Sequence, residues 1–134
     1  MDCLFCKLIA GELPSYKVYE DENVFAFLDI NPVNPGHTLV IPKKHFSTME
    51  DITVEELAEV MKVVKTVGRA IKQGLELDGY NVNINNGEVA GQIVPHLHFH
   101  VIPRKEGDGL DLWPQGKYGD GEAEDTVKKI KGKI

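Results

Sequence analysis

Residues 94–104 read VPHLHFHVIPR and carry three of the chain's five histidines, at positions 96, 98 and 100. Side chains two residues apart on a β-strand lie on the same face of the sheet. We therefore expect a row of imidazoles on one face, with the intervening Leu97, Phe99 and Val101 in the core. A solvated face would favour Thr, Lys or Glu, whereas imidazole is the side chain that titrates near neutral pH. The row of histidines therefore indicates a site of metal binding or catalysis.

Two kinds of chemistry suit such a row. In one, the imidazoles converge on zinc, although neighbouring histidines of one strand normally supply only two ligands and no carboxylate is obvious nearby. In the other, one imidazole attacks phosphorus while its neighbours bind the phosphoryl oxygens and manage protons. Residues 85–94, NNGEVAGQIV, supply glycines that let backbone N–H groups approach a phosphate, which favours the nucleophile.

Short strands account for much of the remaining sequence. β-Branched and aromatic residues predict strands at residues 16–20, 23–30, 37–42, 80–86 and 95–103. A short helix is expected at residues 4–10, ending at Gly11. Strands that pair through short connections, with helices to one side, indicate an α+β domain on an antiparallel sheet.

A long amphipathic helix is the most secure element. Thr53 and Glu56 form a capping-box pattern, and the helix is expected to end near Gly74. Its apolar residues are spaced at three and four: Val54, Leu57, Val60, Met61, Val64, Val67 and Ile71. The tail, residues 105–134, is expected to be irregular except for a short helix at residues 123–130.

Length and charge limit the classes of partner. The 134 residues suit one domain, and the net charge of -6 comes without a basic block, so nucleic acid is not an expected partner. No apolar stretch approaches the roughly 20 residues that span a bilayer, and the first residues lack a secretory pattern. We expect a cytoplasmic protein with no membrane partner.

The histidine stretch resembles the signature of the histidine triad (HIT) family, in which His-x-His-x-His precedes two apolar residues. HLHFHVI, residues 96–102, matches this signature in full. CKLIAGELPSYKVYEDENVFAFLDINPVNPGHTLVIPKKHF, residues 6–46, resembles the family's N-terminal half, so the resemblance covers about residues 3–104. It implies a single HIT domain over residues 1–134: a five-stranded antiparallel sheet, one long and one or two short helices, and a homodimer with a continuous sheet.

The resemblance also implies an enzyme, a nucleotide hydrolase or transferase. His98 would attack the α-phosphorus of a purine nucleoside phosphoramidate or dinucleoside polyphosphate, and water would then release the nucleoside monophosphate. The carbonyl of His96 would hold Nδ1 of His98, His100 would bind the phosphate, and His37 would support the row from the neighbouring strand. The chemical step would need no metal.

A nucleoside site is implied by the same resemblance. Asp29 would accept hydrogen bonds from both ribose hydroxyls, and Asn85, Gly91 and Gln92 would contact the phosphate. The apolar slot for the base would be formed by Phe5, Leu8, Phe27 and Ile30. From sequence alone, core packing explains Phe5, Leu8 and Phe27 equally well, Asp29 also suits a turn cap, and NNG is also a turn signal.

Three local features bear on the reaction. Asn85 favours the phosphoramidate branch, because a glutamine is expected there in the dinucleotide branch, whereas HVIPRKEGD at residues 100–108 favours dinucleotides. Ile93 stands where many phosphoramidate-cleaving members have a serine that helps protonate the leaving nitrogen. The alternative function is a non-catalytic nucleotide-binding or partner-binding module, and a third is a hydrolase that uses the histidine row as a zinc centre.

Cys3 and Cys6, the only cysteines, form a C-x-x-C pair, which in a reducing cytosol indicates a metal site or redox pair. Bacterial and archaeal members of the family often bind zinc through such a pair and two histidines. The matching residues are Cys3, Cys6, His45 and His96, a set that suits a closed tetrahedral structural site. Free thiols and redox chemistry are the alternatives. The resemblance thus implies that His96 binds zinc while His98 and His100 act on the nucleotide.

Overall fold

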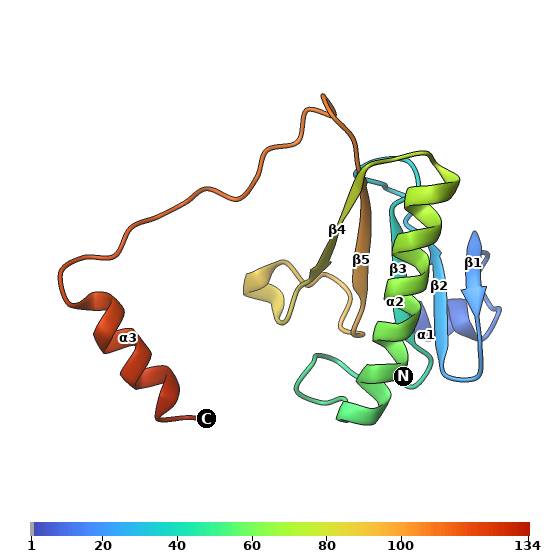
Figure 1. Ribbon diagram of the computed structural model, residues 1–134. Helices are drawn as coiled ribbons and strands as arrows, with labels where there is room; N and C mark the ends of the chain where they lie inside the picture. Colours follow the sequence, from blue (N-terminus) through green and yellow to red (C-terminus); the bar gives the residue numbers. More distant parts are fainter. Residues whose placement is uncertain (1) are drawn as a thin grey trace.

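The computed structural model describes residues 2–134, and a five-stranded antiparallel sheet lies at its centre (Figure 1). In spatial order the strands are β1 (Lys17–Glu20), β2 (Val24–Leu28), β3 (Thr38–Pro42), β5 (Phe99–Arg104) and β4 (Gly79–Ile84). Every neighbouring pair is antiparallel. The predicted α+β class and five-stranded sheet are confirmed.

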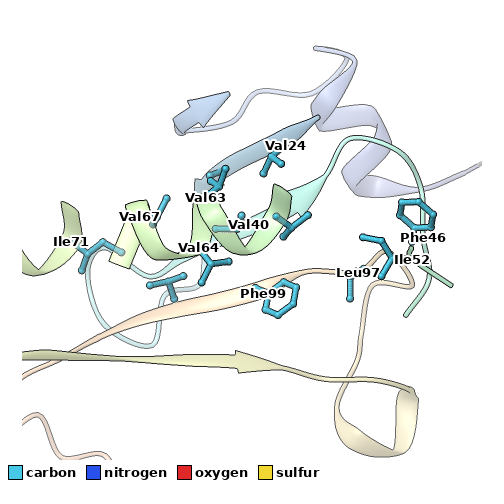
Figure 2. Close-up of a cluster of buried hydrophobic side chains, with 13 residues drawn as sticks. Val24, Val40, Phe46, Ile52, Val63, Val64, Val67, Ile71, Leu97 and Phe99 are labelled. Carbon is cyan, nitrogen blue, oxygen red and sulfur yellow. The ribbon is translucent and has the colours of Figure 1, made fainter. Parts of the chain in front are cut away.

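The long helix α2 (Val54–Gly74) covers one face of the sheet, and Figure 2 shows the core that it forms with the strands. Thr53 caps it as predicted, because its Oγ1 accepts a hydrogen bond from the Glu56 N–H at 3.2 Å. The helical residues of this core are Val60, Val63, Val64, Val67 and Ile71. Val54 and Met61, predicted for the same stripe, are 78% and 40% exposed, whereas Val63 is buried. At about 100° per residue, Val54 and Met61 fall on one side of the buried stripe and Val63 on the other.

A second, smaller core lies on the opposite face, so the expectation that the helices share one side is wrong. Successive side chains of β2 and β3 point to opposite faces, and those that turn away from α2 pack beneath α1 (Leu4–Ile9). This core consists of Cys3, Phe5, Phe25, Phe27, Leu39 and Ile41. Strands β2 and β3 are therefore buried on both faces.

The fifth strand begins at Phe99 and not at residue 95, so of the three histidines only His100 lies in it. The chain bends before it: the His96 N–H donates to the Val94 carbonyl at 2.8 Å, and the Leu97 N–H donates to the Phe46 carbonyl at 2.6 Å. These bonds replace ladder pairing over this stretch. Alternation of side chains persists nonetheless, because Leu97, Phe99 and Val101 are all buried as predicted.

The tail leaves the end of β5 and extends away from the sheet before it forms α3 (Glu122–Lys131), which stands clear of the sheet (Figure 1). The predicted terminal helix is confirmed to within one residue at each end. Leu112 and Trp113 in the tail are 80% and 83% exposed. Within residues 2–134, no helix combines the length and apolar character needed to cross a membrane.

Candidate active site

A cavity of about 650 Å³ opens on the α1 face of the sheet. Its size and largely apolar walls are typical of a site for a small molecule. Three of the five histidines reach it, His37 from the start of β3 and His98 and His100 from the histidine stretch. The residues predicted for the nucleotide that also line it are Phe5, Leu8, Phe27, Asp29, Ile30, Asn85 and Gly91.

His98 has one ring nitrogen without a hydrogen. Its Nδ1 lies 2.7 Å from the His96 carbonyl oxygen, as the family resemblance implies. Because a carbonyl only accepts, Nδ1 carries the hydrogen. Nε2 of the neutral ring is then a bare lone pair. Burial lowers the pKa of His98, with the His96 carbonyl opposing the shift, so the ring is neutral at pH 7. This is the state that a nucleophile requires.

His37 and His100 form a hydrogen-bonded pair, with Nε2 of His37 2.9 Å from Nδ1 of His100. The Val33 N–H donates to Nδ1 of His37 at 3.0 Å, so the hydrogen of His37 is on Nε2. His37 therefore donates to His100, and the hydrogen of His100 is on Nε2. That N–H can bind a phosphoryl oxygen in the cavity. We call Val33, His37 and His100 the histidine relay.

The pKa values of the relay keep it neutral. Burial, followed by the neighbouring His98 and His37, lowers the pKa of His100 to about 4. Burial also lowers the pKa of His37, and the nearby Asp29 opposes this shift. At pH 7 both rings are uncharged, and the direction of their hydrogen bond is set by Val33.

Asp29 caps a turn and also borders the cavity. Its Oδ1 accepts the Asn31 N–H at 2.9 Å, which is the turn-capping role. Its Oδ2 lies 3.7 Å from Nε2 of His37 at the cavity wall. One carboxylate oxygen thus shapes the loop while the other faces the site.

Gln92 does not fit the predicted contact with phosphate. Its side-chain oxygen accepts the Gly87 N–H at 2.9 Å, and its side-chain nitrogen donates to the Ser47 carbonyl at 2.6 Å. Its backbone N–H donates to the Gly87 carbonyl at 3.1 Å. The residue is buried and braces the turn before Gly91, where Asn85 Nδ2 lies 3.4 Å from the Gly91 carbonyl.

Two isoleucines already considered from sequence, Ile30 and Ile93, line the mouth of the cavity and are 79% and 91% exposed. Other residues of the site escaped sequence reasoning. Val33 matters through its backbone N–H, which no side-chain pattern reveals. The apolar wall also includes residues from segments whose positions depend on tertiary packing, namely Leu4, Leu13, Pro14, Leu39 and Val94.

The four predicted metal ligands lie together beside the cavity, and we call Cys3, Cys6, His45 and His96 the cysteine cluster. Their ligand atoms are all within 4.8 Å of one another. Nδ1 of His96 lies 3.5 Å from Sγ of Cys3 and 3.6 Å from Sγ of Cys6, and Nδ1 of His45 lies 3.4 Å from Sγ of Cys6.

These separations fit zinc. In a tetrahedral site with Zn–S of about 2.3 Å and Zn–N of about 2.0–2.1 Å, sulfur and nitrogen ligands lie about 3.6 Å apart. Nε2 of His96 is 2.8 Å from the Pro42 carbonyl, so it carries the hydrogen and leaves Nδ1 bare for a metal. A metal here would join the start of α1 to the segments around His45 and His96.

A family model described as the HIT domain matches residues 10–107. The chain belongs to the histidine triad family. An uncharacterized HIT-like protein of Methanocaldococcus jannaschii is 51% identical over 130 residues, which cover 97% of this chain and 99% of that protein. The adenosine 5'-monophosphoramidase of Saccharomyces cerevisiae is 46% identical over 114 residues, covering 84% and 70%. An adenylylsulfatase of Arabidopsis thaliana is 44% identical over 109 residues, covering 81% and 55%.

Solved structures of HIT proteins share the fold over the full length of the chain. The crystal structure of a HIT family member from Bacillus subtilis has a TM-score of 0.91 at 43% identity, covering 100% of this chain and 98% of that one. A Zn-bound histidine triad family protein from Mycobacterium smegmatis has a TM-score of 0.79 at 36% identity, covering 100% and 99%. The likeness therefore includes the tail.

Proposed function

We propose that this HIT protein is a nucleotide hydrolase or transferase that cleaves at the α-phosphate of a purine nucleoside phosphoramidate or dinucleoside polyphosphate. The observation that carries the proposal is His98, a neutral imidazole whose Nδ1–H is held by the His96 carbonyl and whose bare Nε2 belongs to a cavity-lining ring. Relatives named adenosine 5'-monophosphoramidase and adenylylsulfatase support this class of reaction.

The reaction proceeds in two displacements at phosphorus. Nε2 of His98 forms a bond to the α-phosphorus, the bond from phosphorus to the leaving group breaks, and the leaving group takes a proton from solvent. Water then attacks the same phosphorus and gives a proton to solvent, the electrons of the P–N bond return to Nε2 of His98, and the nucleoside monophosphate is released. The N–H of His100 stabilises the negative charge that develops on the phosphoryl oxygens in both steps.

The nucleoside is held by the rest of the cavity. Oδ2 of Asp29 accepts from the ribose hydroxyls, while Asn85 and the backbone near Gly91 approach the phosphate. The base occupies the apolar slot formed by Phe5, Leu8, Phe27 and Ile30. Phe5 and Phe27 are each 5% exposed, so they form the floor of this slot while remaining part of the second core.

His98→Ala tests the proposal. We expect release of nucleoside monophosphate from adenosine phosphoramidate to fall by about 10³-fold or more, because a covalent intermediate can no longer form. Nucleotide binding, measured by calorimetry, should change little, since the cavity walls remain. Turnover near the wild-type rate in this variant would remove the central claim.

Ile93 supports a second candidate, a nucleotide-binding module without catalysis. Its side chain is 91% exposed at the cavity mouth and offers no hydrogen-bond donor to a leaving nitrogen. A protein that binds adenosine nucleotides but releases no product from a phosphoramidate or a dinucleotide would favour this module.

We also propose that the cysteine cluster binds structural zinc. The distances and the histidine tautomer described above support this proposal, as does the zinc-bound relative from Mycobacterium smegmatis. Protein purified without chelator should contain about one zinc per chain, measured by elemental mass spectrometry. Zinc near zero would contradict it and would favour free thiols.

A homodimer completes the proposal. β4 is an edge strand that pairs with β5 alone among the described residues, so its outer edge can pair with a second copy and continue the sheet. Light scattering coupled to gel filtration should give twice the mass of one chain. The mass of a single chain would show that the edge stays unpaired.

A further inference from the structure

A buried carboxylate at the start of the tail has no part in the chemistry described above. The side chain of Asp108 is only 4% exposed. Its oxygens accept from Nε and Nη2 of Arg104 at 2.7 and 3.2 Å, from the N–H groups of Lys105 and Leu110 at 3.3 and 3.1 Å, and from Nδ2 of Asn34 at 3.2 Å. The Arg104 guanidinium holds the pKa of Asp108 well below its usual range, so the carboxylate is charged at pH 7.

Asn34 connects this carboxylate to the loop before His37. Besides contacting Asp108, its Nδ2 donates to the Pro103 carbonyl at 2.8 Å. The backbone carbonyl of Asn34 accepts the His37 N–H at 3.0 Å. One side chain thus fastens the loop of residues 31–36 both to the end of β5 and to the start of the tail.

The two ends of the loop are held by neighbouring residues: the Asn31 N–H donates to Asp29, and Oγ1 of Thr38 donates to the Gly36 carbonyl at 2.8 Å. Between these ends, Asn34 supplies the side-chain bonds. Two of the loop's six residues, Pro32 and Pro35, have no N–H to donate. Gly36 has a φ of +97°, and a Cβ there would lie 2.5 Å from Cδ1 of Leu75, so the loop packs closely on the end of α2. The loop contributes Asn31 and Val33 to the cavity wall, and its contribution to the histidine relay is the Val33 N–H, 3.0 Å from Nδ1 of His37.

The direction of that hydrogen bond matters for the phosphate. If Nδ1 of His37 carried the hydrogen, its Nε2 would accept from Nδ1 of His100. Nε2 of His100 would then present a lone pair, which repels a phosphoryl oxygen in place of an N–H that binds it. The position of Val33 selects between these two arrangements.

We propose that Asn34 and Asp108 are positioning residues for the histidine relay: they hold the loop so that the Val33 N–H faces His37 and fixes the tautomers of His37 and His100. Neither residue lines the cavity. The catalytic consequence rests on the proposed function, whereas the tautomers are a property of the free protein.

The test is long-range ¹H–¹⁵N NMR of the histidine side chains in the full-length protein as purified. Wild type should show the Nε2–H tautomer for His37 and for His100. Asn34→Ala should populate the other tautomer of His37, with kcat for nucleotide cleavage about tenfold lower and KM changed less. Asp108→Asn should act in the same direction, and if it does not fold, Asn34→Ala decides.

Asp21→Asn is the matched control. Asp21 likewise accepts two backbone N–H groups, those of Asn23 and Val24, both at 2.8 Å, but in the turn between β1 and β2. It should lose stability without changing the histidine spectrum. A wild-type spectrum in Asn34→Ala, or the same change in Asp21→Asn, would overturn the inference. If wild type cleaves no nucleotide, the proposed function fails, and the spectrum still decides this inference.

Discussion

The cysteine cluster and the histidine relay lie on the same face of the sheet and both use imidazoles, yet they present opposite ends of the ring to their ligands. In the cluster, Nε2–H of His96 donates to the Pro42 carbonyl, so Nδ1 has no hydrogen and can bind a metal. In the relay, the Val33 N–H occupies Nδ1 of His37 and directs the Nε2 hydrogen to His100. The backbone group at one nitrogen decides what the other nitrogen can do.

The same rule separates neighbours within the HxHxH motif. His96 donates from Nε2 to a carbonyl, whereas His98 donates from Nδ1 to one, so their bare nitrogens are Nδ1 and Nε2 respectively. The acceptor for His96 is distant in sequence, at Pro42, whereas the acceptor for His98 is the His96 carbonyl within the motif.

Within the two groups, the largest expected effect comes from removing His100, the residue of the relay whose N–H faces the cavity. His100→Ala should lower kcat for nucleotide cleavage by about 10²- to 10³-fold, as expected for losing one donor to developing negative charge. Zinc content and thermal midpoint should stay close to wild type, since His100 is not in the cysteine cluster. Loss of bound zinc in this variant would show that the two groups are not separate.

A change in the cysteine cluster should affect stability more than catalysis. Cys6→Ser should release zinc and lower the free energy of unfolding by about 3 kcal/mol, or the thermal midpoint by about 10 °C. Below that midpoint, kcat should fall less than threefold, because the proposed reaction uses no metal. Rate lost in proportion to zinc at constant fold, after chelation, would instead indicate a catalytic zinc.

The pH profile distinguishes neutral from charged histidines. The pKa values of His98 and His100 are lowered from the ordinary 6.5, and that of His100 to about 4. Protonation would remove the lone pair of His98, so activity is present above the lowered pKa values and lost as pH falls through them. We expect kcat/KM to be level between about pH 8 and 6.5 and to fall only below that range. Half-loss of kcat/KM above pH 6.5 would contradict the burial argument.

The smallest expected effect is at the cavity mouth. Ile93→Ser restores a hydroxyl donor near the leaving group and should raise kcat a few-fold for phosphoramidates, with no change for dinucleoside polyphosphates. Val89→Ser is the control, because Val89 is equally exposed but does not line the cavity. Equal gains in both variants would mean that solubility, and not proton donation, is responsible.

Local patterns in the sequence predicted the fold well where one rule dominates. The capping box at Thr53 and the three-and-four spacing placed α2, and alternation placed Leu97 and Phe99 in the core. The errors at Val54 and Met61 arose because more than one face of a helix satisfies that spacing, and only packing against the sheet selects one.

The site was predicted less completely for a physical reason. The resemblance to the HIT family implied His98, Asp29 and the cysteine cluster, whereas hydrogen bonds from the backbone cannot be seen in side-chain identity. The contribution of Val33 and the internal bonding of Gln92 depend on loops whose shape is set by tertiary contacts. The bend before Phe99 likewise follows from the Leu97 bond to Phe46, which is distant in sequence.

The most direct test of the account is intact-protein mass spectrometry after brief mixing with an adenosine phosphoramidate, on wild type and on His98→Ala. The account predicts a transient adduct of one AMP mass on wild type alone, followed by release of AMP. Binding of the nucleotide to wild type with neither adduct nor released AMP would contradict it and would leave the protein as a binding module.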